Sequence, residues 1–386
     1  MQLELKVLAP TRYGWAFNGP RTSRHRVVNR VFLPLNKITA DYEGVTVLAP
    51  GLFDNFDLVH AFNRIPIGST PYIIGFESHL PRGYGMEHTA YYARLVKSLL
   101  SDRCLGIIAI SDHAIRGLTA YHEHKPYWPE LRRKLHFRFP NLIAPDIEDT
   151  LADGPLDEIR LTFVGAHFAR KGGCVAVRIA ELARERGLPV VVDIISKLEC
   201  GGAIWTDPPD PAFYAPYMAG LSAPNIRLHP SLPNAEVLRL LRQSHFGLLT
   251  TFGDTFGYSA IESMINHTPV VATAQCALPE FITDGDDGIL LSLPVNDRRE
   301  WIHSMSPQRA TSGFARMFRD EVERLAHQGL DRILETLADP VGYRRMRVRA
   351  RETAYRRFNH LDAQAYWDDF YVRALKGTLP EAIGTD

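Results

Sequence analysis

The residues that decide the fold are FGLLTTFGDTFGYSAIESMINHTPVVAT, numbered 246–273. They open with an apolar run that is typical of a buried strand, and a loop follows it. After the loop, Ile261, Met264 and Ile265 recur at the spacing of one helix face. A second run, rich in β-branched residues, ends at Thr273. The stretch therefore predicts a strand, a loop, a helix and a second strand, the unit from which α/β folds with parallel sheets are built.

Two carboxylates flank the start of the predicted helix. Asp254 lies in the loop, Glu262 lies in the first turns of the helix, and seven residues separate them. A helix N-terminus offers unpaired N–H groups and a positive dipole end, so the backbone near Phe256 and Gly257 can hold a phosphate. The carboxylates can accept hydrogen bonds from sugar hydroxyls. The alternatives are an aspartate that caps a turn and an ordinary exposed glutamate on a helix.

Length and composition indicate a globular protein with room for two domains. The chain has 386 residues, 45% hydrophobic and 23% charged, and its 44 basic residues balance 44 acidic ones. Such a chain can bury a large core, and it has no net charge to attract nucleic acid. The cysteines form no C-x-x-C pair, which argues against a zinc ribbon and fits a reducing compartment. We expect a cytoplasmic protein with neither a secretion signal nor a membrane-spanning segment.

Strands and helices alternate through both halves of the sequence. A strand at 3–8 and a glycine-containing loop at 9–20 begin the first half, and the stretch 141–156, which contains prolines and aspartates, is typical of a linker. We therefore expect a first domain over residues 1–150 and a second over 151–355. Each should contain a parallel sheet covered by helices.

A second candidate site lies in GAHFARKGG, residues 165–173, after a strand predicted at 159–164. Lys171 stands where this strand-to-helix loop opens, beside glycines that allow the backbone to approach a ligand closely. An ammonium group there can neutralise a diphosphate, and the alternative is a solvated surface lysine. Further along the chain, a helix is predicted at 234–243, with Asn234 as its expected N-cap.

Three motifs in the second half resemble the donor-binding domain of retaining glycosyltransferases with the GT-B fold, specifically glycosyltransferase family 4, also called group 1. They are VGAHFARKGG at 164–173, DTFGYSAIESMINHTPVVAT at 254–273 and LPEFITDGDDGILL at 278–291. In that family a strand leads to a loop like G-R-x-x-x-x-K-G, and two glutamates with seven residues between them precede a P-V-V-A-T run. The first half adds family-like ISDHA at 110–114 and PN at 140–141.

The resemblance implies an α/β fold of GT-B architecture, with two Rossmann-like doubly wound parallel-sheet domains facing across a cleft. A C-terminal helix within 356–386 would cross back to the first domain. The implied activity is hexosyl transfer from a UDP- or GDP-sugar to a glycan or lipid-linked acceptor, with retention of configuration and without a cofactor or a metal. Such enzymes serve polysaccharide or glycolipid biosynthesis in the cytoplasm, and a lipid-linked acceptor is compatible with peripheral contact at the cytoplasmic membrane face.

The matching positions imply a set of site residues. His79 in FESHLPRG, together with Asp254 and Lys171, would act at the transferred sugar, although a lone histidine can also be structural. Glu262 would accept hydrogen bonds from the ribose of the nucleotide. The residues implied to bind the donor are Gly165, Arg170, Lys171, Phe256, Gly257 and Glu262.

Two positions depart from the family pattern. Ala166 stands where many members have an arginine, which leaves Arg170 as a possible substitute for one diphosphate contact. Asp254 replaces the first glutamate, and its shorter reach can change the sugar preference. These departures support a second hypothesis, a catalytically impaired sugar-nucleotide-binding partner subunit. A nicotinamide-dependent enzyme is disfavoured because G-x-G-x-x-G is absent.

No acidic pair suited to a metal ion is evident in the sequence. Asp207 and Asp210 are separated by prolines, and the acidic cluster at 284–287 belongs to a predicted turn. The charge on a departing nucleoside diphosphate would then be carried by the lysine and arginine of the first loop and by helix N-termini.

The segment HEHKPYWPELRRKLHFRFP, residues 122–140, is both basic and aromatic and admits three interpretations. It can be a solvated face, a patch that touches anionic lipid headgroups through Tyr127 and Trp128, or a surface for the acceptor. Nucleic-acid binding has the least support, because neither a recognition motif nor an overall positive charge accompanies the segment.

Overall fold

The computed structural model describes residues 4–11, 13–34, 44–47, 55–83, 85–149 and 157–380. Its contacts divide the chain into an N-terminal unit, Met1–Ile143 with Arg357–Asp386, and a C-terminal unit, Ala144–Arg356. The first boundary precedes the expected one near residue 150, because Asp149 is bound within the C-terminal unit by Arg347. Of the predicted features, position 3 of the first strand, positions 150–156 of the linker and positions 381–386 of the last segment lie outside the described residues.

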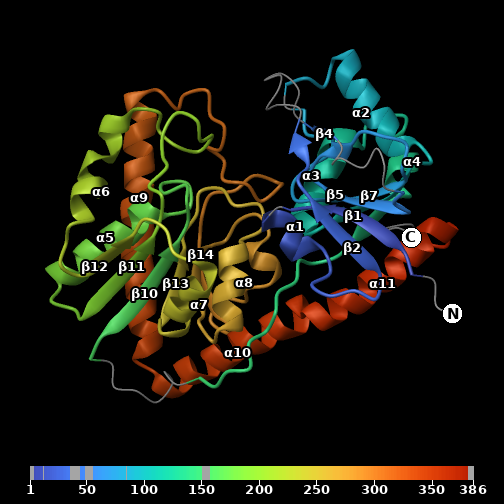
Figure 1. Ribbon diagram of the computed structural model, residues 1–386. Helices are drawn as coiled ribbons and strands as arrows, with labels where there is room; N and C mark the ends of the chain where they lie inside the picture. Colours follow the sequence, from blue (N-terminus) through green and yellow to red (C-terminus); the bar gives the residue numbers. More distant parts are fainter. Residues whose placement is uncertain are drawn as a thin grey trace. The chain divides into compact units, whose positions relative to one another are not determined.

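The C-terminal unit is built on six parallel strands in the order β12-β11-β10-β13-β14-β15 (Figure 1). They are β10 (Ile159–Val164), β11 (Val190–Ile195), β12 (Ile226–His229), β13 (Phe246–Leu249), β14 (Val270–Thr273) and β15 (Gly288–Leu291). The chain enters the sheet in the middle at β10, builds outward to β12, and returns to the other side of β10 with β13. This is a doubly wound order, and it reverses between β10 and β13.

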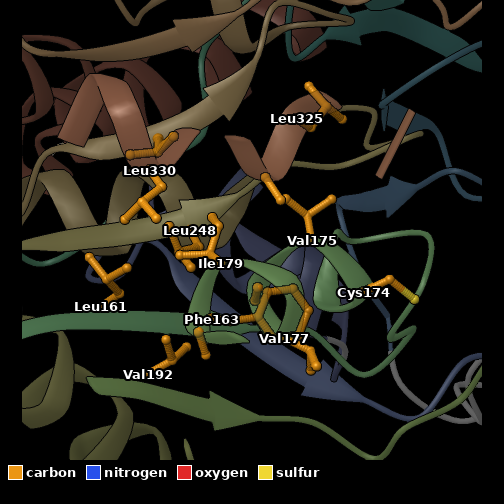
Figure 2. Close-up of a cluster of buried hydrophobic side chains, with 14 of the residues drawn as sticks. Leu161, Phe163, Cys174, Val175, Val177, Ile179, Val192, Leu248, Leu325 and Leu330 are labelled. Carbon is orange, nitrogen blue, oxygen red and sulfur yellow. The ribbon is translucent and has the colours of Figure 1, made fainter. Parts of the chain in front are cut away.

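Helices pack against both faces of this sheet, because alternate strand residues point to opposite sides. The helices are α5 (Gly173–Glu185), α6 (Ala215–Gly220), α7 (Asn234–Arg242), α8 (Tyr258–Ile265), α9 (Ser312–Leu337) and α10 (Pro340–Phe358). Leu161 and Phe163 of β10 join a core cluster with α5 and α9, which Figure 2 shows. Val164, on the other face, packs with Val237 and Leu241 of α7.

The N-terminal unit has a second parallel sheet, in the order β2-β1-β5-β7-β8-β9. Its strands are β1 (Lys6–Pro10), β2 (Arg26–Arg30), β5 (Leu58–Phe62), β7 (Tyr72–Phe76), β8 (Cys104–Ala109) and β9 (Leu135–Phe137). A small separate sheet contains β3 (Leu33–Pro34), β4 (Val45–Val47) and β6 (Ile65–Pro66). The predicted pair of parallel sheets covered by helices is confirmed. A short strand is also expected from the sequence at 45–48, where β4 lies, but its pairing with β3 and β6 in a separate sheet was not predicted.

Five helices of the described residues belong to the N-terminal unit. They are α1 (Tyr13–Asn18), α2 (Ala90–Leu100), α3 (Asp112–His122), α4 (Trp128–Arg132) and α11 (His360–Lys376). The last helix returns to this unit from the end of the chain, and Trp367 and Phe370 pack with Val7, Leu58 and Ile73 of the sheet. The C-terminal segment therefore contributes to the core of the N-terminal unit.

One local prediction in the N-terminal unit needs correction, and the structure adds detail to a second segment. The expected loop at 9–20 contains α1, because Trp15 and Phe17 supply buried side chains. The basic and aromatic segment contains the end of α3, all of α4 and β9, and Tyr127 and Trp128 are half-buried against the core. These rings therefore contribute to the packing of the unit and stay partly exposed. None of the helices among the described residues is both long and apolar enough to cross a membrane.

Candidate functional site

The candidate site lies at the carboxyl edge of the C-terminal sheet, where the strand order reverses. The β10 loop (165–172) and the β13 loop (250–257) follow the two adjacent strands that flank this point. The loops are joined by hydrogen bonds, because the Phe252 N–H and the Thr251 hydroxyl both donate to the Arg170 carbonyl at 2.8 Å. Open parallel sheets bind their ligands at this kind of position.

Two glycines allow helices to begin at this edge. Gly172 and Gly257 cap the N-termini of α5 and α8, and both have positive φ, +98° and +93°. A Cβ atom on Gly172 would lie 2.4 Å from the Thr250 carbonyl oxygen, and one on Gly257 would lie 2.7 Å from Leu278 Cδ2. Only glycine fits these positions without displacing the backbone or strand packing.

Lys171 and Asp254 form an ion pair that connects the two loops. Lys171 Nζ donates to Asp254 Oδ2, and their side chains are 20% and 9% exposed. Burial alone would raise the pKa of Asp254, but the charges of Lys171 and Arg170, with hydrogen bonds from Lys171 and the Phe256 backbone, hold that pKa below its ordinary value. Asp254 is therefore a carboxylate at neutral pH, and it positions the ammonium group.

Phe256 contributes to this pair through its backbone and not through its ring. The Phe256 side chain is fully buried and stacks on Phe281, with ring centroids 5.4 Å apart. Its N–H is the backbone group that bonds the Asp254 carboxylate. The predicted donor-binding role of Phe256 can therefore concern only its main chain.

Glu262 is buried in the second turn of α8 and is held by Asn234. Asn234 Nδ2 donates to Glu262 Oε1 at 3.0 Å. The prediction of Asn234 as an N-cap is wrong, because the cap position belongs to Pro233 and no side chain caps α7 there. A buried carboxylate needs hydrogen-bond donors, and this need outweighs the local preference of asparagine for capping. Asn234 is thus a site residue that the sequence pattern missed.

Arg170 is fixed by three contacts beside the ion pair. Its Nε donates to His167 Nδ1 at 3.0 Å, its Nη1 donates to the Gly253 carbonyl, and its guanidinium lies 4.8 Å from the centroid of the Trp205 ring. The pKa of His167 is lowered by burial first and by the Arg170 charge second. Neutral His167 accepts from Arg170 at Nδ1, so its proton is on Nε2, 3.4 Å from Glu199 Oε2.

His79 belongs to the N-terminal unit. It is buried and stacked on Tyr121 of α3, with centroids 4.6 Å apart and an interplanar angle of 14°. Nearby Glu77 accepts hydrogen bonds from Asn63 Nδ2 and Arg82 Nη2, both at 3.0 Å. The stack gives His79 a packing role in the N-terminal unit.

The C-terminal unit thus gathers seven of the predicted residues at one edge of one sheet. They are Gly165, Arg170, Lys171, Asp254, Phe256 (through its main chain), Gly257 and Glu262. Asn234 and Trp205 are added by the structure. Within the described ranges, no three or more His, Cys, Asp or Glu side chains are grouped so that they could hold a metal ion.

Replacing Gly165 with alanine should disturb the lysine without unfolding the unit. The added Cβ would lie 2.8 Å from Lys171 Cβ and 3.0 Å from Lys171 Cγ, so the lysine stem has to move. A displaced catalytic or binding group commonly costs about tenfold or more in rate, and we expect a fall of this size in kcat/KM. Gly313→Ala is the control, because its Cβ would meet Thr311 Oγ1 at an ordinary 3.8 Å. Equal activity of both variants would contradict the prediction.

Sequence comparisons locate the family likeness in this unit. Residues 158–306 match the family described as Glycosyl transferases group 1. D-inositol 3-phosphate glycosyltransferase from Thermobifida fusca is 31% identical over 138 residues, 36% of this chain and 32% of that protein. The protein of the same name from Corynebacterium aurimucosum is 28% identical over 177 residues, 45% of this chain and 38% of that protein. The matched segments span about a third of the length of these curated relatives.

Solved structures share the fold along nearly the whole chain. A glycosyltransferase from Rickettsia africae has a TM-score of 0.60 at 12% identity and covers 97% of this chain and 99% of its own. Anabaena HepE in complex with UDP-glucose has a TM-score of 0.57 at 13% identity and covers 96% of this chain and 100% of its own. Sucrose-phosphate synthase from Thermosynechococcus elongatus has a TM-score of 0.58 at 13% identity and covers 97% of this chain and 100% of its own. The fold is therefore of the GT-B type, and residues 158–306 are similar to the family described as Glycosyl transferases group 1, as the motifs predicted.

Proposed function

We propose that this chain is a retaining, metal-independent hexosyltransferase that moves a sugar from a UDP- or GDP-sugar to a glycan or lipid-linked acceptor. The observation that supports it most is the Lys171–Asp254 pair, which joins the two loops at the reversal point of the sheet. A cation, a carboxylate and two helix N-termini meet there, and together they suit a diphosphate attached to a sugar.

Each residue has a distinct task in this proposal. Lys171 binds the diphosphate, and its charge is retained as the nucleoside diphosphate departs. Asp254 then accepts a hydrogen bond from a hydroxyl group of the transferred sugar, and its bond with Lys171 weakens. Glu262, oriented by Asn234, accepts hydrogen bonds from the ribose. Cationic side chains and helix N-termini carry the leaving-group charge, so the proposed mechanism needs no metal ion.

Relatives of known structure support a sugar nucleotide as the donor. Anabaena HepE has been solved with UDP, with UDP and glucose, and with UDP-glucose. The pneumococcal O-GlcNAc transferase GtfA has been solved with UDP and GlcNAc. Because these structural relatives bind UDP or UDP-glucose, UDP-sugars are the first donors to test with this chain. A cytoplasmic location is part of the proposal, because all four cysteines are unpaired.

His79 is proposed to hydrogen-bond the transferred sugar from the N-terminal unit. Its stack on Tyr121 offers a sharp test, because His79→Phe keeps an aromatic ring in the stack and removes the imidazole nitrogens. We expect kcat to fall about a hundredfold while the melting temperature stays near that of the wild type. A variant with wild-type kcat would assign His79 to packing alone.

A panel of UDP- and GDP-sugars tests the proposed function directly. The donor should raise the melting temperature of the full chain, since a ligand that binds only the folded state stabilises it. The same donor should be hydrolysed slowly without acceptor and consumed faster with a suitable glycan or lipid-linked acceptor. Retention is read from the anomeric configuration of the product, and metal independence from turnover in excess chelator. Absence of binding to every sugar nucleotide would contradict the proposal.

A catalytically impaired binding subunit is the second candidate. Ala166 and Asp254 favour it, because each departs from the family pattern at a position near the diphosphate or sugar. This candidate predicts donor binding without hydrolysis or transfer. Turnover by the isolated chain would exclude it.

Glu262→Gln should weaken donor binding about tenfold, because it removes the charge that accepts the ribose hydrogen bonds. Asn234→Ala should weaken donor binding by roughly threefold, because Glu262 would keep its charge and lose one orienting bond. Donor KM and the Kd of the matching nucleoside diphosphate measure both effects. Glu236→Gln, which alters an exposed glutamate paired with Arg239, is the control and should bind as the wild type does. Equal Kd values for all four proteins would remove Glu262 from the donor site.

A further inference from the structure

Helix α10, labelled in Figure 1, has one face buried in the C-terminal unit and one face exposed. On the inner face Tyr343 and Met346 join the core cluster of the unit. Beside them Arg351 donates to the carbonyl groups of Ile265 and Pro145, both at 2.7 Å. These contacts fix the rotation of the helix about its axis, so the residues of the opposite face stay at the surface.

Three exposed apolar side chains form a ridge along this outer face. Val341, Val348 and Tyr355 are 74%, 42% and 47% exposed. They follow one another at intervals of seven residues, close to two turns of a helix, so they lie nearly in one line about 21 Å long. Apolar side chains at this spacing usually face a core, whereas here they face solvent. The apolar ridge (Val341, Val348 and Tyr355) is therefore available to an external surface.

Exposed arginines flank the apolar ridge on both sides. Because about 3.6 residues make one turn, Arg345, Arg349 and Arg356 lie beside the ridge on one side. Arg344 lies on the other side and is also exposed. Within its 19 residues α10 has seven arginines and one acidic residue, Glu352, which lies 3.1 Å from Arg349. The outer face therefore carries an excess of positive charge in a chain whose charges balance overall.

The combination of charge and apolar surface selects the kind of partner. A nucleic-acid duplex would attract the arginines through its phosphates, but it offers no apolar layer to the ridge. A second copy of this face would bring arginines against arginines, and like charges repel. A bilayer with anionic lipids complements both features, because its headgroup phosphates attract arginine and its boundary with the acyl chains accepts apolar side chains.

We propose that the outer face of α10 binds peripherally to a bilayer that contains anionic lipids. The helix lies parallel to the membrane plane, with the apolar ridge at the headgroup boundary and the flanking arginines at the phosphates. This inference goes beyond the proposed function, because lipid binding needs neither the donor nor any residue of the candidate site. It also concerns a different surface from segment 122–140, whose Tyr127 and Trp128 pack against the core of the N-terminal unit.

Flotation of the full chain with phosphatidylcholine vesicles, with and without phosphatidylglycerol, tests the charged part of this surface. We expect binding only to the vesicles with the anionic lipid, and release at high salt, which screens exposed charges. The arginine variant combines Arg345→Gln, Arg349→Gln and Arg356→Gln. Its affinity for anionic vesicles should fall roughly a hundredfold, because each arginine near such a surface contributes about fivefold. The matched control makes the same change of charge at three exposed arginines of α9 and should bind as the wild type does: Arg316→Gln, Arg319→Gln and Arg324→Gln.

A second variant tests the apolar ridge while it keeps every charge. Val348→Ser combined with Tyr355→Ser should weaken binding to anionic vesicles about tenfold, because less apolar surface enters the bilayer. Tyr355→Trp should bind more tightly than the wild type, since tryptophan favours the membrane interface. All of these positions are exposed, so the melting temperatures should stay near that of the wild type, which separates loss of binding from loss of folding.

Three results would overturn the inference. The first is a wild-type chain that does not bind anionic vesicles, and the second is an equal loss of binding in the α10 and α9 arginine variants. The third is unchanged binding in the ridge variant, because charge alone would then hold the helix, as it would on a nucleic acid or an acidic protein. Donor binding is measured separately by melting temperature, so the proposed function and the bilayer surface can each fail without the other.

Discussion

Replacing Lys171 with alanine is expected to lower kcat/KM for the donor by at least about a hundredfold. The proposal makes this ammonium group a ligand of the diphosphate, and its stem is packed against Gly165 at the reversal point of the sheet. Without it, the leaving group loses a charge-assisted hydrogen bond and meets the Asp254 carboxylate directly. Steady-state kinetics measure the loss. Lys197→Ala removes an exposed lysine of the same unit and should have wild-type activity.

The same substitution should also destabilise the C-terminal unit at neutral pH. Asp254 is buried, and it would lose the ion pair while it keeps the field of Arg170 and the hydrogen bond from the Phe256 N–H. Leaving a buried carboxylate partly uncompensated costs roughly 1–3 kcal/mol in the free energy of unfolding. The double variant Lys171→Ala with Asp254→Asn should recover most of this stability and none of the activity, which separates folding from function.

Stability should respond to pH in opposite senses in the wild type and in Lys171→Ala. In the wild type the pKa of Asp254 is held below its ordinary value, so the pair stabilises the fold above the unfolded-state pKa. That contribution is lost as the pH falls through the lower folded-state pKa. In the variant, burial is no longer offset by the lysine, so it should raise the pKa of Asp254. The buried charged carboxylate then lowers the free energy of unfolding at neutral pH, and this loss vanishes in acid, where the carboxyl is protonated. Urea unfolding between about pH 3 and pH 8 measures both curves.

Two results would contradict this account of the lysine. Wild-type kcat/KM in Lys171→Ala with the best donor would show that the ammonium group does not bind the diphosphate. A stability difference between the two proteins that stayed constant from neutral to acid pH would show that the buried aspartate does not feel the lysine. The kinetic and the titration results are independent, so either can fail alone.

The sequence predicts the C-terminal sheet well, because its strands are continuous apolar runs between polar loops. The predicted strand 159–164 has the bounds of β10. The small sheet of the N-terminal unit is different, since β3 and β6 have only two residues each, too few for a periodic pattern. Pairing with distant residues makes them strands, as with Leu33 and Val47. Local sequence carries no signal for such pairing.

Some residues of the candidate site can be predicted from the nearby sequence, and others depend on tertiary contacts. Lys171 and Asp254 follow from motif spacing within two short loops, and the fold brings those loops together. Asn234 does not follow, because the local rule for an asparagine at the start of a helix favours capping, and a tertiary contact with Glu262 overrides it. Trp205 is likewise invisible to motif analysis, since only the folding of its loop places it on Arg170.

Replacing Arg347 with methionine is expected to lower the free energy of unfolding of the C-terminal unit by about 3 to 5 kcal/mol. The Arg347 side chain is fully buried, and its Nε and Nη2 atoms lie 2.6 and 2.7 Å from the two carboxylate oxygens of Asp149. Its Nη1 donates to the Ser244 carbonyl at 3.1 Å, shortly before β13. Burial alone would lower the pKa of Arg347, but its hydrogen bonds to Asp149 and the nearby Tyr343 raise it. The charge is therefore kept inside the unit only because its partners are in place.

Arg349→Met on the same helix is the matched control for this prediction. Arg349 Nη1 lies 3.1 Å from Glu352 Oε2, but the two side chains are 54% and 59% exposed, so the loss should stay below about 1 kcal/mol. Equilibrium urea unfolding compares both variants with the wild type. Arg347→Met with Asp149→Asn should be more stable than Arg347→Met alone, because the second change removes the carboxylate that lost its guanidinium. Equal losses of unfolding free energy at positions 347 and 349 would show that burial does not set the strength of the Arg347–Asp149 pair. The pair would then not explain why Asp149 belongs to the C-terminal unit.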